Sequence, residues 1–134
     1  MKTFVVAVVL VAAVAATSLP DAEKALLKKL HETCQSKPET HADDALLKKF
    51  SDNLHDDKVM HHMTCIAKGA GMVTEGGTID KTVMKKKVGM VMEDQHAVDE
   101  VVMKCGVDKE NDKETAMHMW MCFKENHVHY MPEF

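Results

Sequence analysis

The sequence predicts an all-α protein, a compact bundle of about six short helices held by two disulfides. Apolar residues recur at intervals of three and four positions, and the alternation typical of β-strands is nearly absent. Four cysteines, separated by 30, 39 and 16 residues, fall at or inside the predicted helices. An even number of cysteines in a short exported chain is normally a disulfide framework. The sequence alone does not choose among the three pairings of Cys34, Cys65, Cys105 and Cys122.

Residues 1–16 have the features of an export signal. Lys2 supplies a positive charge, an unbroken apolar run covers residues 4–14, and small residues follow up to Ala16. The apolar stretch is shorter than the ~20 residues that a membrane-spanning helix needs. The alternative, a buried N-terminal helix, fits this order of features less well. We therefore expect a secreted, extracellular protein without membrane insertion.

The remaining residues, 17–134, fit one domain with one core. They keep 16 of the 17 basic residues and all 21 acidic residues, which gives a formal charge of −5. A mildly acidic surface argues against nucleic acid and anionic membranes as partners. The lysine run 85–87 does not reverse this, because consecutive helical residues point in different directions.

The first two predicted helices cover about residues 21–34 and 42–54. The first begins at Pro20-Asp21 and carries an apolar stripe of Leu26, Leu27 and Leu30. The second follows the helix breaker Pro38 and carries Leu46, Leu47, Phe50 and Leu54. Both stripes are spaced to bury one face of a helix.

The next two predicted helices cover about residues 56–70 and 79–92. The earlier one opens with acids that suit a helix N-terminus, ends near two glycines, and turns inward Val59, Met63, Ile66 and Ala70. The later one follows the loop 74–77 and takes Thr78 as its N-cap. Its core residues are Val83, Met84, Val88 and Val91.

The last two predicted helices cover about residues 94–105 and 112–126. The first of these stops at Gly106 and places on one face Val98, Val101, Val102 and Cys105. The second brings together Ala116, Met119, Trp120 and Phe123.

With these helices and cysteines, the chain resembles the insect odorant-binding and pheromone-binding proteins. The resemblance is to the four-cysteine, or minus-C, branch, to which beetle haemolymph and accessory-gland carriers also belong. The family pattern has six cysteines, and its second and fifth positions hold His61 and Lys113 here. These two missing cysteines would bond to each other, so no thiol is left unpaired. The likeness covers essentially the whole chain after residue 16, although the gap from Cys105 to Lys113 is one residue shorter than usual.

The resemblance implies the pairing Cys34 with Cys65 and Cys105 with Cys122, around a closed apolar cavity. Such bridges close loops of roughly 32 and 18 residues, each worth about 3 to 4 kcal/mol in the chain-entropy estimate. The resemblance also implies a carrier of odorant, pheromone, fatty-acid-like or terpenoid molecules. Nothing in the sequence demands a dimer, so we expect a monomer. A membrane receptor at delivery is a further implied partner, and no cofactor is expected.

The predicted pocket consists of inward residues on the later four helices. After residue 16 the chain has eleven methionines but only five aromatic residues. Methionine side chains are flexible and repack around guests of different shape. We expect reversible partition of an apolar guest, although each pocket residue also suits an ordinary core. Polar head groups would be met by Thr82, Thr115, Tyr130 or a histidine. The predicted pocket residues are Met63, Ile66, Met84, Val88, Val91, Val98, Val102, Met119, Trp120 and Phe123.

Nine histidines suggest a pH-sensitive element, because imidazoles titrate near neutrality. The C-terminal segment 127–130 holds two of them, and related carriers use such a segment to cover the pocket. Protonation of His127 or His129 is therefore predicted to loosen a lid. No metal site is predicted, because the adjacent His61 and His62 project about 100° apart on a helix. No two cysteines have zinc-knuckle spacing.

No catalytic pattern is recognisable. The chain lacks G-x-S-x-G, a phosphate loop, H-E-x-x-H and an EF-hand, and Asp56 in the dipeptide His55-Asp56 suits a helix start. We therefore expect no enzyme. The alternative to a carrier is a secreted structural or interaction protein of haemolymph or gland secretion without a specific ligand. The two differ in whether the interior takes up guests.

Overall fold

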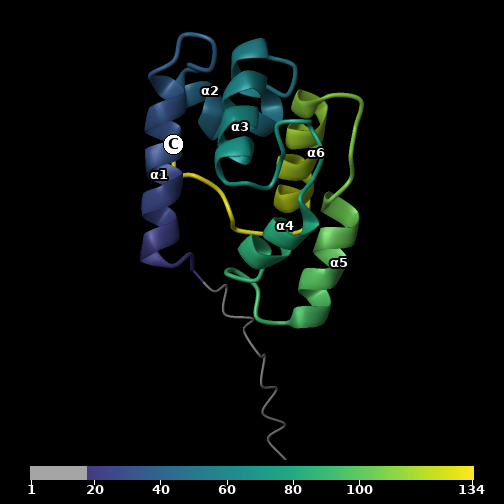
Figure 1. Cartoon of the computed structure of the whole chain (residues 1–134). Coiled ribbons are helices and arrows are strands. Elements are labelled where there is room, and N and C mark those ends of the chain that lie inside the picture. The colour runs from purple at the N-terminus through teal and green to yellow at the C-terminus, as the bar shows by residue number, and fades with distance from the viewer. Residues whose placement is uncertain (1–17) are drawn as a thin grey trace, which may run out of the picture.

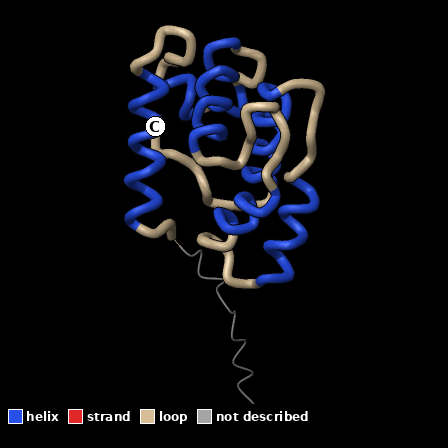
Figure 2. Tube along the Cα trace, in the orientation of Figure 1, coloured by secondary structure: helices blue, strands red, loops and turns tan. Residues whose placement is uncertain are grey.

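The computed structural model describes residues 18–134 as six α-helices and one 3₁₀ turn, as Figures 1 and 2 show. Within this range no β-strand forms, and an isolated bridge joins Val73 to Ile79. The predicted fold class is confirmed, and the proposed signal 1–16 lies outside the described residues. None of the described helices is long and apolar enough to span a bilayer. The elements are α1 (Asp21–Gln35), α2 (Asp44–Lys48), η1 (Phe50–Asp52), α3 (Asp57–Gly69), α4 (Lys81–Val88), α5 (Gln95–Cys105) and α6 (Asp112–Glu125).

Helices α3 and α6 form the centre of the bundle. They make the most extensive helix–helix contact, and α1 packs on α3 while α5 packs on α6 (Figure 1). The Trp120 Nε1–H group of α6 donates a buried hydrogen bond of 3.0 Å to the Met63 carbonyl oxygen of α3. Trp120 and Phe123 lie edge to face, with ring centroids 5.9 Å apart. The two helices therefore share both an apolar and a polar contact.

Two disulfides join this central pair to the flanking helices. Cys34 of α1 bonds to Cys65 of α3, and Cys105 at the end of α5 bonds to Cys122 of α6. No free cysteine occurs in the described part of the chain. The pairing implied by the family resemblance is thus confirmed.

The predicted N-cap of the fourth helix is wrong. The Asp80 side chain, and not Thr78, caps α4 by accepting a hydrogen bond of 3.1 Å from the Val83 amide. The Thr78 hydroxyl is 2.8 Å from the Thr74 hydroxyl, and the two close the turn before the helix. Helix α4 therefore begins later than predicted, and it ends at Val88 instead of continuing to residue 92.

The second predicted helix is also wrong as a continuous element, because the chain divides residues 42–54 into α2 and η1. The break lies at Lys49, whose φ of −113° and ψ of 38° are not helical. After the break, the Asn53 side-chain amide donates a hydrogen bond of 3.0 Å to the Lys49 carbonyl oxygen. This arrangement buries both Leu47 and Phe50. The tertiary core, and not helix propensity, decides the local geometry here.

Replacing Cys105 and Cys122 together by alanine should lower the free energy of unfolding by about 3 kcal/mol, because the disulfide shortens the free chain of the unfolded state. The two residues are 17 positions apart. The matched pair Cys34 and Cys65, 31 positions apart, should cost slightly more. Urea unfolding followed by Trp120 fluorescence measures both. A loss below about 1 kcal/mol for either pair would contradict the expectation.

Candidate functional site

The ten predicted pocket residues lie in one apolar core. Nine of them are at most 5 % exposed, and Val102 is partly buried against the same cluster. They come from α3, α4, α5 and α6 and from the segment that follows α4. The three methionines among them, Met63, Met84 and Met119, have no exposed surface. Flexible, polarisable side chains therefore occupy the middle of the bundle.

The C-terminal segment 127–134, called the tail below, covers this core on the side of α1. Figure 1 shows it leaving the end of α6 and crossing the molecule to reach α1. Val128, Tyr130 and Pro132 are buried, whereas His127 and His129 are exposed. In residues 18–134, neither histidine side chain forms a hydrogen bond or ion pair with the protein. The tail is therefore held by residues other than the two histidines that the sequence pointed to.

The strongest polar contact of the tail is a buried cluster of three side chains. The Tyr130 hydroxyl donates a hydrogen bond of 2.5 Å to Glu23 Oε1, and the Lys87 ammonium group pairs with the same oxygen. Tyr130 has no exposed surface and Glu23 is 8 % exposed. The cluster joins the tail to α1 and α4.

The charges of this cluster follow from its hydrogen bonds. Burial pushes the pKa of Glu23 upward, but the hydrogen bonds from Lys87 and Tyr130 outweigh burial and hold this pKa below its ordinary value. Burial and the adjacent Glu23 raise the pKa of Tyr130. At neutral pH, Glu23 is therefore a carboxylate, and Tyr130 is a neutral donor.

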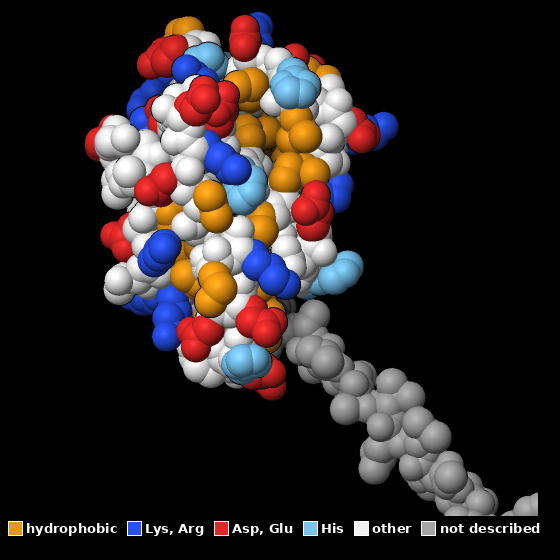
Figure 3. Space-filling model, turned by 90° about the vertical axis from the view of Figure 1, so that its right-hand side faces the viewer, with side chains coloured by type: hydrophobic (Ala, Val, Ile, Leu, Met, Phe, Trp, Pro, Cys, Tyr) orange, Lys and Arg blue, Asp and Glu red, His pale blue; other side chains and the backbone are white. Residues whose placement is uncertain are grey.

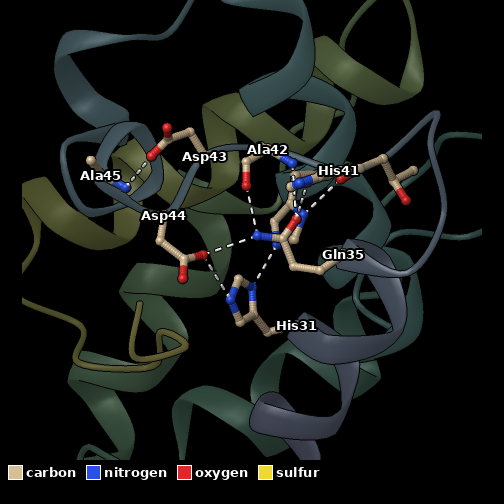
Figure 4. A network of polar contacts seen from close by, with 9 residues as sticks. His31, Gln35, His41, Ala42, Asp43, Asp44 and Ala45 are labelled. Carbon is tan, nitrogen blue, oxygen red and sulfur yellow. Dashed lines mark hydrogen bonds and ion pairs between the residues drawn. The ribbon is translucent and has the colours of Figure 1, made fainter.

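A second polar network joins α1 and α3 to α2 and to the segment before it, and Figure 4 shows His31 and Asp44 within it. His62 Nδ1 is 2.7 Å from the Thr40 carbonyl oxygen, and His62 Nε2 is 2.8 Å from His31 Nδ1. His31 Nε2 is 3.1 Å from Asp44 Oδ1. A carbonyl and a carboxylate only accept, so the three contacts together need three ring protons on the two imidazoles, with one proton shared between His62 Nε2 and His31 Nδ1. The last residue, Phe134, packs edge-on against both imidazoles.

His62 itself is held neutral. Its side chain has no exposed surface, and burial lowers its pKa to about 4 despite the hydrogen bond to Thr40. The neutral ring donates at Nδ1 to Thr40 and accepts at Nε2 from His31.

Comparison with known proteins places this bundle in a family. The sequence pattern of the PBP/GOBP family matches residues 16–126. The chain belongs to the PBP/GOBP family. This is a family of non-enzymatic binding proteins, which confirms the prediction that the chain is not an enzyme. Membership indicates a carrier of small hydrophobic ligands, and disulfide-bonded members are typically secreted.

Two curated relatives cover most of the chain. The B2 protein of Tenebrio molitor is 30% identical over 115 residues, which is 84% of this chain and 88% of the relative. The B1 protein of the same organism is 27% identical over 114 residues, 84% of this chain and 87% of the relative. No solved structure gives a significant match.

Three surface hollows of this PBP/GOBP protein lie away from the predicted pocket residues, none of which lines them. One, of about 430 Å³, lies over the Cys34–Cys65 disulfide, and one of about 630 Å³ lies between α1 and the tail. A third, of about 410 Å³, is lined by Leu54, three methionines and His118, among other residues. On the face seen in Figure 3, hydrophobic side chains gather between histidines and charged groups. The ten predicted residues thus lie inside the core, and none of these three hollows opens onto them.

Three residues of these clusters were not predicted from the sequence: Glu23, Lys87 and Phe134. One signal for Glu23 was available, because it precedes Leu27 by four positions and continues the inward stripe of α1. A carboxylate at a core position needs a buried partner. No sequence signal pairs it with Lys87, which lies 64 positions away.

Replacing Lys87 by methionine should lower the free energy of unfolding by about 3 kcal/mol, because it leaves a buried carboxylate without its counter-ion. The matched control is Lys85→Met on the same helix. Lys85 pairs with Asp99 at 3.0 Å, but both side chains are more than half exposed, so this change should have little effect. Urea unfolding compares the two variants. Equal effects would show that the Glu23 cluster contributes no more than a surface ion pair.

Stability should fall as the pH drops from about 6.5 to about 4, because the unfolded chain takes up a proton at His62 that the native protein excludes. The native pKa is about 4, compared with an ordinary value of 6.5. Stability from this group is complete above pH 6.5 and is lost progressively toward pH 4, by up to about 3 kcal/mol. Urea unfolding of the protein and of His62→Gln between pH 7 and pH 4 measures this loss of stability.

The His62→Gln variant should show a shallower pH dependence of its unfolding free energy, and His61→Gln controls for loss of an imidazole from α3. Parallel curves for His62→Gln and the unmodified protein would refute the assignment.

Proposed function

We propose that this protein is a secreted carrier that reversibly binds one small hydrophobic molecule in its central core. The observation that carries the proposal is the placement of the ten inward residues in one apolar cluster, within a chain of a binding-protein family. Its proposed guests are odorant, pheromone, fatty-acid-like or terpenoid molecules. The proposal includes a monomeric carrier, with a membrane receptor as a partner at delivery.

The physical mechanism is partition from water into an adaptable interior. An apolar guest gains about 25 cal/mol for each Å² of its surface removed from water. The core residues already pack against one another, so entry requires them to move apart. Met63, Met84 and Met119 can do this at lower cost than branched side chains, because unbranched thioethers have several accessible rotamers. The disulfides hold the helical frame while these side chains rearrange.

Titration of oxidised residues 17–134 with N-phenyl-1-naphthylamine tests the proposal. Saturable uptake of one dye per chain is expected, with displacement by apolar guests and a change in the emission of Trp120, which lies in the core. Titrations at pH 7 and pH 5 also test the predicted role of the tail histidines. If the folded, disulfide-bonded protein takes up no guest, the alternative of a secreted interaction protein is favoured.

A matched pair of substitutions locates the guest. Val88→Phe places extra volume in the core and should weaken dye binding at least tenfold, at a stability cost of about 1 to 3 kcal/mol. Val107→Phe makes the same chemical change at a residue that is 36% exposed and should leave dye binding unchanged. Circular dichroism confirms that both variants are folded. If the two variants bind the dye equally well, the guest lies outside the core.

A further inference from the structure

The surface hollow of about 410 Å³ beside α6 is lined mainly by methionines and histidines. The methionines are Met60, Met117 and Met121, and the histidines are His55 and His118. Met60 belongs to α3, His55 to the segment before it, and the other three residues to α6. The hollow therefore brings thioether sulfurs and imidazole nitrogens together from both central helices.

The packing of α3 against α6 explains why these side chains share one hollow. Lys68, near the end of α3, pairs with Asp112 at the start of α6 at 2.8 Å. Trp120, in the second half of α6, donates to Met63 in the middle of α3. The two helices are therefore antiparallel, and the turn of α3 that holds Met60 lies beside the turn of α6 that follows Trp120.

The residues from α6 form one patch opposite that turn of α3. Met121 follows Met117 by four positions and His118 by three, and residues at these spacings are neighbours on the surface of a helix. Met121 is partly buried, as is Met60 across the helix contact. Methionine side chains have several rotatable bonds, so the three sulfurs can turn toward one point beside the imidazole.

The His118 imidazole has a nitrogen available for a further contact. Its Nδ1 atom is buried and has no hydrogen-bond partner within residues 18–134. Burial, and next the nearby Lys109 ammonium group, lower the pKa of His118. The ring is therefore neutral at pH 7 and has a lone pair that a metal ion can accept. A buried polar atom without a partner costs free energy, which a bond to a metal ion would recover.

This set of donor atoms fits copper(I) better than other metal ions. Soft thioether sulfur selects copper(I), and imidazole also suits copper. Calcium and magnesium need several oxygen ligands, and Glu114 supplies the one carboxylate in the described lining of the hollow. The Lys109 ammonium group in the same lining has the opposite charge. All four cysteines form disulfides, so no thiolate competes for the ion.

We propose that the three methionine sulfurs of this hollow and His118 Nδ1 bind one copper(I) ion. None of these residues is among the ten predicted pocket residues, so the copper site is separate from the core in which the hydrophobic guest is proposed to bind. Its existence therefore does not depend on the carrier function. Binding requires rotation of the methionine side chains and no change in the oxidation state of the ion.

The first test measures copper(I) affinity by competition with bicinchoninate, a coloured chelator, under argon with ascorbate as the reductant. Uptake of one ion per oxidised protein is expected. The double variant Met117→Leu and Met121→Leu should bind roughly tenfold or more weakly, because loss of even an outer-shell partner costs 10–100-fold. Leucine keeps the apolar volume, so only the thioethers are lost. The control Met103→Leu, at a residue that is 78% exposed, should bind as the unmodified protein does. Equal affinities of all three proteins would overturn the proposal.

A second pair of variants separates this site from the histidines of the tail. His118→Gln should also weaken copper(I) binding by roughly tenfold or more. His127→Gln combined with His129→Gln removes two exposed imidazoles of the tail and should leave the affinity unchanged. If the tail variant loses copper(I) and His118→Gln keeps it, the ion binds at the tail and the proposal is wrong.

Nuclear magnetic resonance of methionine methyl groups locates the ion in the unmodified protein. Copper(I) is diamagnetic, so the methyl signals of its ligands stay visible and change position when it binds. The signals of Met60, Met117 and Met121 should shift with one equivalent of copper(I), and that of Met103 should not. Assignment through contacts with neighbouring residues makes this result independent of whether any variant folds. Shifts confined to other methionines, or no shift at all, would refute the site.

Discussion

The contact between α3 and α6 is the interaction on which the rest of the structure depends. Trp120 packs into this contact and donates to the Met63 carbonyl oxygen, so the two helices are fixed in both spacing and register. Each of the two helices also carries one cysteine that bonds to a flanking helix, Cys65 to α1 and Cys122 to α5. The disulfides therefore extend the central pair outward in both directions. A small domain that buries a limited apolar area gains much of its stability from such links.

The C-terminal tail covers one side of the core, and in doing so it buries polar side chains. It brings Tyr130 to a carboxylate of α1 that is already paired with an ammonium group of α4, and it places Phe134 against two imidazoles. Buried ion pairs contribute little net stability compared with apolar packing. Their directional hydrogen bonds do fix one position of the tail among many apolar alternatives. Polar contacts thus fix the position of the tail, and apolar contacts pack it against the core.

The core combines adaptable apolar side chains with polar groups that are held by hydrogen bonds. Methionines such as Met63, Met84 and Met119 can change rotamer around a guest, whereas hydrogen-bonded groups such as Trp120 and Tyr130 are held in place. The mobile and the fixed parts of the interior therefore consist of different residues.

The sequence by itself determined the all-α fold class, most of the helices, the family and the apolar residues of the core. Spacing of three and four residues is a local property of the chain, so the inward stripes of α3, α5 and α6 could be predicted, and the disulfide pairing followed from the family resemblance. The break at Lys49 and the use of Asp80 instead of Thr78 as a cap were not predicted, because burial of Phe50 and closure of the turn at Thr74 depend on neighbouring segments. The tertiary structure alone decided that Glu23 meets Lys87 and Tyr130, and that His31 meets His62. Hydrogen bonds between residues far apart in the chain leave no periodic signal, so only the folded arrangement shows which polar groups pair.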